Sequence, residues 1–218
     1  MTNEPDSKVH QGEAPASNSL GMMPARQRGH LLDLPREPRS YLSTPGKSLQ
    51  KVTRWLNARW RLRACTQVGR WTRLVGRPFV SNRGQLVIGD RVQLFSHYAR
   101  SVFAVFPGGR LEIGDRTFLN YGLDIAATRL VRIGADCMIG THVIILDNDF
   151  HEVSDHTRMP RPRPVIIGNR VWIGNRATIL PGVSIGDDSV VGAGSVVVSD
   201  IPAHSVAVGN PARVVKSL

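Results

Sequence analysis

A branched apolar residue stands at every sixth position in one stretch of the chain, from Ile167 to Val197. The six positions are Ile167, Ile173, Ile179, Ile185, Val191 and Val197. Four residues after these positions stand small or branched residues, among them Val171, Ala177, Val183 and Ser189. An α-helix repeats every ~3.6 residues and a strand every ~2, so neither produces this spacing. A repeat of six residues is typical of a parallel β-helix.

The six-residue step extends toward the N-terminus. It is found at Val68, Leu74 and Val80, at Ile88 and Leu94, at Ile113, Leu119 and Ile125, and at Ile133, Ile139 and Ile145. Three hexads make one triangular coil of about 18 residues. Coil starts near residues 68, 88, 113, 133, 167 and 185 therefore predict an all-β solenoid of about six coils over residues 67–218.

A short phrase, Ile-Gly followed by Asp, Asn or Ala, recurs nearly once per predicted coil. It begins at Ile88, Ile113, Ile133, Ile167 and Ile185. Gly, Asn and Asp tolerate the backbone geometry of tight turns. We expect the phrase to mark the same corner of every coil.

The repeat is interrupted by residues 147–164, between the hexad positions Ile145 and Ile167. Loops that interrupt a rigid solenoid are where function concentrates. His151 lies in this loop, with the carboxylates Asp147, Asp149 and Glu152 close in sequence. A histidine near carboxylates commonly accepts a proton from a hydroxyl or amine nucleophile. The alternative is a solvated loop histidine among solvated acids.

The N-terminal third differs from the repeat in composition. Residues 1–45 are rich in Pro, Ser, Asn and Arg, and we expect them to be disordered because they can bury little apolar surface. Residues 46–66 predict a short basic helix with Leu49, Val52, Leu56 and Trp60 near one face. One interpretation is a cap that covers the edge of the first coil. The other is contact with anionic lipid or with a phosphorylated acceptor.

The net charge of +11 is uneven. Residues 1–78 hold 14 Lys and Arg against 5 acids, whereas residues 79–218 hold 14 against 12. No nucleic-acid recognition motif accompanies the basic excess, so we expect no nucleic-acid partner. No apolar run is long enough to span a bilayer, no secretory leader is visible, and Cys65 and Cys137 form no CxxC motif. We expect a cytoplasmic protein, with the inner face of the membrane as an alternative location.

Residues 133–218 resemble the left-handed β-helix hexapeptide-repeat acyltransferases, in particular the galactoside and maltose O-acetyltransferase branch. The resemblance is carried by four blocks in the same order and spacing, namely residues 167–175 (IGNRVWIGN), 179–186 (ILPGVSIG), 191–195 (VGAGS) and 209–216 (GNPARVVK). It is looser over residues 68–132. It implies a left-handed coil, acetyl-CoA as donor substrate without a metal, and a homotrimer with donor and acceptor in the cleft between adjacent solenoids.

The resemblance also implies roles for individual residues. His151 falls where the family has its catalytic histidine, which takes the proton from the acceptor hydroxyl. Asn120 matches the family's acceptor-binding Asn, and we add Asp149 as a second residue for the acceptor. Asn175, Ala193, Arg213 and Lys216 match the positions that contact CoA, with a solvated C-terminal tail as the alternative for Arg213 and Lys216.

The chain departs from the sugar O-acetyltransferases at several positions. Val198 and Ser199 replace a common Thr-Lys pair, and Thr128 replaces the carboxylate of their second acceptor contact. The N-terminal segment differs as well. These departures point away from a free galactoside or maltose and toward a sugar of a polysaccharide, a lipopolysaccharide or a related glycan.

Two other classes of function are consistent with a β-helix. One is a scaffold without catalysis. The other is a zinc protein similar to the γ-carbonic anhydrases, because His151 and His156 have the five-residue spacing of two of that family's zinc ligands. N-acylation of an amino sugar is a variant of the acyltransfer hypothesis, and His142 is expected to be a surface residue at a coil corner.

Overall fold

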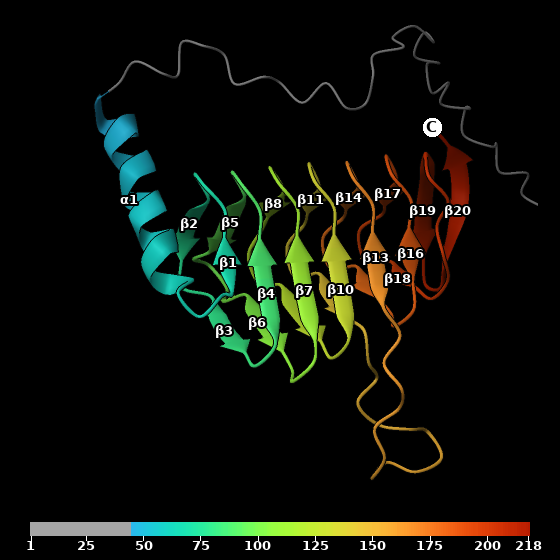
Figure 1. Ribbon diagram of the computed structural model, residues 1–218. Coiled ribbons are helices and arrows are strands. Elements are labelled where there is room, and N and C mark those ends of the chain that lie inside the picture. Colours follow the sequence, from blue (N-terminus) through green and yellow to red (C-terminus); the bar gives the residue numbers. More distant parts are fainter. Residues whose placement is uncertain (1–44) are drawn as a thin grey trace, which may run out of the picture. The chain divides into compact units, whose positions relative to one another are not determined.

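The structure is a computed structural model that describes residues 45–218 (Figure 1). The segment predicted to be disordered, residues 1–45, lies outside the described residues except for its last position. Residues 45–218 form one helix, α1 (Pro45–Arg61), followed by a parallel β-helix with three sheets. In Figure 1 the front strands run upward and the chain crosses over the top to the back as it advances to the right, which is a left-handed coil.

Each coil contributes one strand to each sheet, in the order A, B, C. Sheet A consists of β1 (Gln67–Val68), β4 (Gln85–Ile88), β7 (Arg110–Ile113), β10 (Leu130–Ile133), β13 (Val165–Ile167) and β16 (Ser184–Ile185). Sheet B consists of β2 (Arg73–Gly76), β5 (Gln93–Ser96), β8 (Phe118–Leu119), β11 (Met138–Ile139), β14 (Trp172–Ile173), β17 (Val190–Val191), β19 (Ser205–Gly209) and β20 (Ala212–Ser217). Sheet C consists of β3 (Phe79–Asn82), β6 (Val102–Val105), β9 (Asp124–Ala127), β12 (Ile144–Leu146), β15 (Thr178–Ile179) and β18 (Val196–Val197). All pairs are parallel except β19 with β20.

The hexad positions form the core of the solenoid. In sheet A, Ile88, Ile113, Ile133, Ile167 and Ile185 lie in register above one another and are all buried. Equivalent columns occupy sheets B and C, so the six predicted coil starts are confirmed. The chain then adds part of a seventh coil, in which Ile201 pairs with Ile185 and β19 pairs with β17.

The Ile-Gly phrase marks the corner between sheets A and B, as expected, but the glycine has a different role from the one predicted. A Cβ on Gly114 would lie 2.5 Å from the backbone of Gly134 in the next coil, so the glycine permits close stacking. The left-handed backbone falls two residues later, at Arg116 with a φ of 57°. The Asp115 side chain accepts the Asp90 N–H of the preceding coil at 2.8 Å, which ties the two coils together.

Helix α1 lies across the open end of the first coil (Figure 1). Ala58 and the following Leu62 are buried against the solenoid, and the Asn57 amide donates to the carbonyls of Leu74 and Gly76 at 3.1 and 3.2 Å. These carbonyls belong to β2, the edge strand of sheet B, and pairing them protects that edge. The helix therefore covers the first coil.

The face that α1 turns to the solenoid is not the one that carries its larger apolar side chains. Leu49, Val52, Leu56 and Trp60 are more than half exposed and lie on the opposite side of the helix from Ala58. On the docked side, Ala58 lets the helix approach closely and Asn57 bonds the strand edge directly. The helix thus has two apolar sides, of which one is left uncovered.

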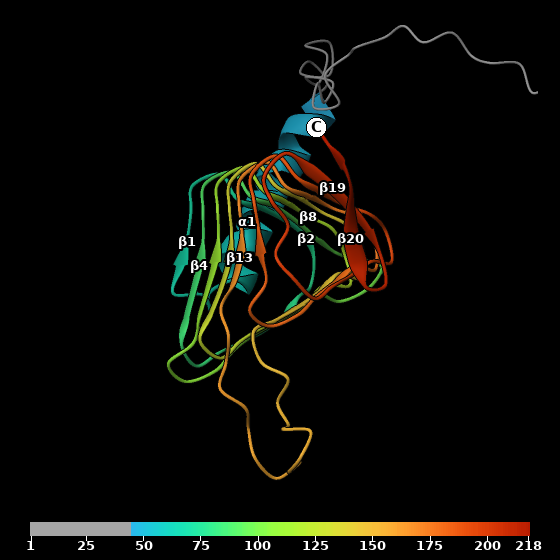
Figure 2. The ribbon, with the colours of Figure 1, turned by 90° about the vertical axis from the view of Figure 1, so that its right-hand side faces the viewer.

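The insertion leaves the solenoid at the corner between sheets C and A, after β12 and before β13. It extends well beyond the other corners on that side (Figure 2). Among residues 45–218, no helix is long and apolar enough to cross a membrane.

Candidate functional site

The base of the loop is fixed by a buried carboxylate. Both oxygens of Asp147 face the preceding corner: Oδ1 accepts the backbone N–H and the hydroxyl of Thr128, each at 2.8 Å. Oδ2 accepts the N–H groups of Arg129 and Leu130 at 2.6 and 2.8 Å. Asp147 has no solvent exposure. A carboxylate that accepts four hydrogen bonds is a rigid anchor.

A second set of contacts shapes the stem of the loop. The buried Asn148 donates from its amide to the Pro160 carbonyl at 3.0 Å and accepts the Phe150 N–H at 2.6 Å. The Asp149 carboxylate lies 3.7 Å from the Arg163 guanidinium on the returning segment. The Phe150 ring packs on the Phe106 ring of a preceding corner, with centroids 5.5 Å apart. The loop is held at its stem from several directions.

His151 lies exposed beyond this stem, and its ring is oriented by a backbone carbonyl. Its Nδ1 lies 2.7 Å from the carbonyl oxygen of His156. A carbonyl can only accept, so Nδ1 carries the proton in this contact, and in the neutral ring Nε2 is the nitrogen with the free lone pair. Nε2 is therefore available to receive a proton from a substrate.

The carboxylates that flank His151 in the sequence do not orient it. Asp147 points back to the preceding corner, and Asp149 pairs with Arg163. The partner is the carbonyl of His156, a backbone atom that the sequence pattern did not predict. Thr128 uses its hydroxyl to hold Asp147.

Three other candidate residues share the corner between sheets B and C. Asn120 follows β8, Asn175 follows β14 and Ala193 follows β17. The Asn175 Oδ1 accepts the Thr141 N–H at 2.9 Å, and its backbone carbonyl accepts the Gly194 N–H at 2.8 Å. Among the hydrogen bonds of residues 45–218, none uses the exposed Ala193 N–H, which can donate to a ligand.

An aromatic cluster surrounds Asn120 at the same corner. The Tyr121 ring stands edge-on to both Tyr98 and His142, with centroids 5.4 and 5.7 Å apart, and His97 lies 4.0 Å from Tyr98. Tyr98 is 80 % exposed. We did not predict this cluster from the sequence, because its members come from three coils and no spacing rule connects them. Exposed aromatic rings beside an amide suit the faces and hydroxyls of a sugar.

Arg213 and Lys216 lie on β20 at the C-terminal end of the solenoid, and both are exposed. The Arg213 guanidinium donates to the adjacent Ala212 carbonyl at 2.9 Å, which leaves its other N–H groups available.

One chain does not bring all candidate residues together. Asn120, Asn175 and Ala193 lie at the corner between sheets B and C, whereas His151 extends from the corner between sheets C and A. Sheet C separates the two corners. A site that uses both requires that a second solenoid lie alongside the first.

The cysteines are not suited to form an acyl-enzyme. Burial raises the pKa of Cys65 to about 12 and that of Cys137 to about 11. Both therefore remain neutral thiols at neutral pH, and the thiol is a poor nucleophile compared with the thiolate.

The described residues bring no three His, Cys, Asp or Glu side chains together as a metal site. His151 and His156 meet through a ring nitrogen and a backbone carbonyl, not through two ring nitrogens.

Two hollows of the described surface lie away from His151. One of ≈ 490 Å³, lined by Gly109, Arg110 and Arg129 among others, occupies the corner on the N-terminal side of the loop. The hollow with the most apolar lining lies beside α1.

Comparison with known proteins supports the class of fold described above. The family model "Bacterial transferase hexapeptide (six repeats)" matches residues 164–199, which include Asn175 and Ala193. The chain is 40 % identical over 114 residues to galactoside O-acetyltransferase of Escherichia coli K12, covering 51 % of this chain and 56 % of that protein. It is 32 % identical over 149 residues to a protein of the same organism provisionally named a lipopolysaccharide biosynthesis O-acetyl transferase, covering 63 % and 74 %.

A solved structure of galactoside acetyltransferase in complex with coenzyme A superposes with a TM-score of 0.53 at 28 % identity, covering 79 % of this chain and 81 % of that one. The sequence match covers little more than half the length of the galactoside enzyme. The fold and the matched repeats define a hexapeptide-repeat transferase. Within that class, the chain belongs to the hexapeptide-repeat acetyltransferase family.

Proposed function

We propose that this protein transfers an acetyl group from acetyl-CoA to a hydroxyl group of a sugar, with His151 as the general base. The observation that carries the proposal is the 2.7 Å contact between Nδ1 of His151 and the His156 carbonyl. In the neutral ring this contact makes Nε2 the basic nitrogen, at the end of an anchored loop. The family membership supplies the class of reaction. The departures at Thr128 and Val198 favour a sugar within a larger glycan as the acceptor.

In the proposed reaction, Nε2 of His151 takes the proton of the acceptor hydroxyl as its oxygen attacks the thioester carbonyl carbon. The C–O bond forms and a tetrahedral intermediate carries the negative charge on the former carbonyl oxygen. The C–S bond then breaks, the CoA sulfur leaves and takes the proton back from His151. The products are a sugar acetate ester and free CoA, with no covalent enzyme intermediate. A positioned base contributes about 10²–10⁴-fold to the rate of such a step.

We place the donor along the corner between sheets B and C. Asn175 and the free Ala193 N–H would contact the pantetheine arm, and Arg213 with Lys216 would meet the phosphates. Asn120, with the Tyr98–Tyr121 cluster, would hold the acceptor sugar, and Asp149 would contact it from the loop. Because the two corners are separated by sheet C, the site is completed by a neighbouring solenoid in a homotrimer. The cytoplasm is the proposed location, since acetyl-CoA is the donor.

The test is an assay with acetyl-CoA and a panel of glycan, free-sugar and amino-sugar acceptors. Release of the free CoA thiol and a gain of one acetyl group in the acceptor, read by mass spectrometry, support the proposal. Mild base hydrolyses an acetate ester and leaves an amide intact, so the same products separate O- from N-transfer. Thiol release that requires no acceptor, or no release with any member of the panel, contradicts the proposal.

Arg213 gives a prediction about the donor. The Arg213→Ala variant should bind CoA about tenfold more weakly than the wild type, because a hydrogen-bonded ion pair with phosphate is lost. Isothermal titration calorimetry measures this. The matched control is 3′-dephospho-CoA, for which the two proteins should differ less. Absence of CoA binding by the wild type would favour the scaffold interpretation, and stoichiometric zinc in the purified protein would favour the γ-carbonic-anhydrase-like alternative.

A further inference from the structure

The outward side of α1 is an uncovered apolar surface. Three apolar residues follow Leu49 at spacings of three, seven and eleven, namely Val52, Leu56 and Trp60. These spacings place all four on one face of the helix. Their exposed fractions are 67, 52, 53 and 60 %. The helix already makes its contacts to the solenoid with the opposite side, through Asn57 and Ala58. We call these four residues the apolar stripe.

Cations surround the apolar stripe. Between Pro45 and Gly89 the chain has ten Lys and Arg residues and no Asp or Glu. The guanidinium groups of Arg61 and Arg63 lie 4.8 and 5.7 Å from the centroid of the exposed Trp60 ring. A helix with an apolar face, a tryptophan and flanking arginines has the composition of helices that lie in a membrane interface.

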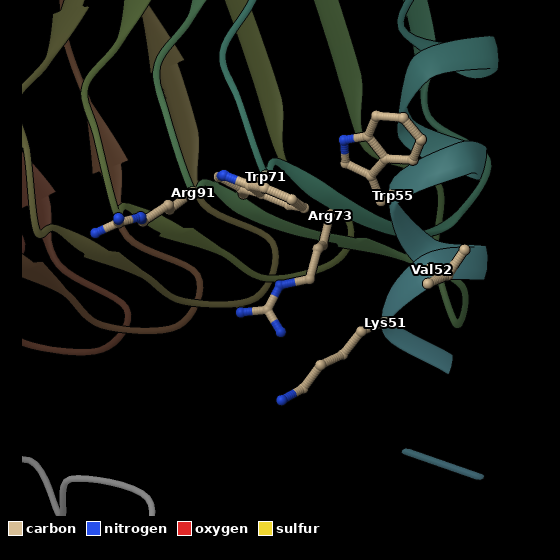
Figure 3. A pocket seen from close by; sticks show the side chains of 6 residues that line it. All are labelled: Lys51, Val52, Trp55, Trp71, Arg73 and Arg91. Atoms are coloured by element: carbon tan, nitrogen blue, oxygen red, sulfur yellow. The ribbon is translucent and has the colours of Figure 1, made fainter. Parts of the chain in front are cut away.

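A pocket beside the N-terminal half of α1 adds a site for an anion (Figure 3). It has a volume of ≈ 330 Å³ and is lined by Lys51, Val52, Trp55, Trp71, Arg73 and Arg91. Figure 3 shows the Arg73 guanidinium and the Lys51 ammonium reaching to the same side, below the Trp71 ring. Val52 belongs both to this pocket and to the apolar stripe, so the two features are continuous.

Within residues 45–218, the three cations of the pocket have no carboxylate partners. Further along the same corner, Arg116 pairs with Asp136 at 2.6 Å and Arg170 with Asp188 at 2.6 Å. In contrast, no ion pair within residues 45–218 includes Lys51, Arg73 or Arg91. Two indole rings and three unpaired cations suit a ligand that joins a phosphate to an apolar part.

A second basic hollow lies at the other end of α1. It has a volume of ≈ 610 Å³, and its lining includes Arg61, Arg77, His97 and Arg100. The two hollows lie near opposite ends of α1, which lies across the end of the solenoid (Figure 1).

We propose that α1 docks this end of the protein on a bilayer that contains anionic phospholipid. The apolar stripe enters the headgroup boundary, and Lys51, Arg73 and Arg91 contact a lipid phosphate. Charge complementarity favours a lipid surface over the two other candidates for covering the stripe, which are residues 1–44 and a second copy of the chain. Residues 1–44 contain five basic and five acidic residues and have no net charge, and a second copy would bring the same positive surface. A negatively charged lipid surface complements the stripe and the pockets together.

The test uses the full-length chain and sedimentation with vesicles of phosphatidylcholine alone or mixed with phosphatidylglycerol. We expect binding only to the mixed vesicles, weakened by salt. The Leu56→Gln/Trp60→Gln double variant changes no charge, and its binding should fall at least about tenfold because apolar insertion is lost. Arg91→Gln should weaken binding about fivefold, as expected for one basic residue at an anionic surface.

Lys216→Gln is the matched control, because it removes one exposed charge at the opposite end of the solenoid. It should change vesicle binding less than about twofold. Unchanged binding of the double variant would show attraction by net charge alone and would overturn the proposal, as would absence of binding by the wild type. A change of oligomeric mass in the double variant, measured by light scattering, would also overturn it by assigning the stripe to contact between copies.

Discussion

Replacement of His151 by alanine should lower kcat for the proposed acetyl transfer by about 10²–10⁴-fold, because the acceptor hydroxyl would lose its base. CoA affinity should remain close to that of the wild type, because His151 lies at a different corner from Asn175 and Ala193. The measurement is the release of free CoA thiol at saturating donor and acceptor, with calorimetry for CoA binding. The exposed position of His151 makes loss of folding an improbable source of the effect.

The loop provides a matched control in His156. It contributes its backbone carbonyl to the contact with His151, so His156→Ala keeps that carbonyl and removes a second histidine ring from the same loop. Turnover by this variant should stay within about threefold of the wild type, since no reacting group is removed. Equal turnover by His151→Ala and wild type would refute the mechanism. If both variants were equally inactive, a role shared by the two rings, as in a zinc site, would be favoured.

The sequence predicted the solenoid well because the hexad pattern records burial one residue at a time. Ile133, Ile167 and Ile185 stack in one column because each is the inward residue of its coil. In a solenoid the neighbours of such a residue are its equivalents one coil away, so the pattern defines long-range contacts. The seventh, incomplete coil was not predicted, because Ile201 and β19 follow an irregular step after Val197.

The orientation of α1 could not be predicted from hydrophobicity. The stripe from Leu49 to Trp60 is the more apolar side, yet it is not the side that docks. The solenoid instead takes the side with Asn57 and Ala58, because the edge of β2 presents carbonyls that need a donor and the small Ala58 permits close approach. Hydrogen bonding to the backbone carbonyls of β2 thus outweighs burial of the larger apolar side chains in setting the orientation of α1.

The candidate site was predictable at the level of its loop and not at the level of its contacts. The break in the hexads located residues 147–164, and the family resemblance selected His151. The contacts that orient it involve the carbonyl of His156 and the backbone N–H groups that hold Asp147. Backbone atoms are the same in every residue, so no spacing of side chains predicts them.

Replacement of Asp147 by alanine should cost stability and activity together. The buried carboxylate accepts three backbone N–H groups and the Thr128 hydroxyl, all of which lose their acceptor in the variant. Each buried donor left unpaired costs about 1–3 kcal/mol, so a total loss of at least about 3 kcal/mol is expected. Urea denaturation measures the free energy of unfolding. Acetyl transfer, assayed where the variant is still folded, should fall at least about tenfold because the stem no longer positions His151.

Asp200 separates this anchoring role from the general effect of losing a carboxylate at a coil corner. It lies at the corner between sheets C and A, two coils beyond Asp147, and accepts one N–H, that of Ser184, at 2.7 Å. Asp200 is exposed, so water can replace the lost acceptor, and Asp200→Ala should cost about 1 kcal/mol or less. Its turnover should match that of the wild type. Equal losses in the two variants would mean that the four bonds of Asp147 act no differently from one bond at the surface, and that the loop stem does not position the base.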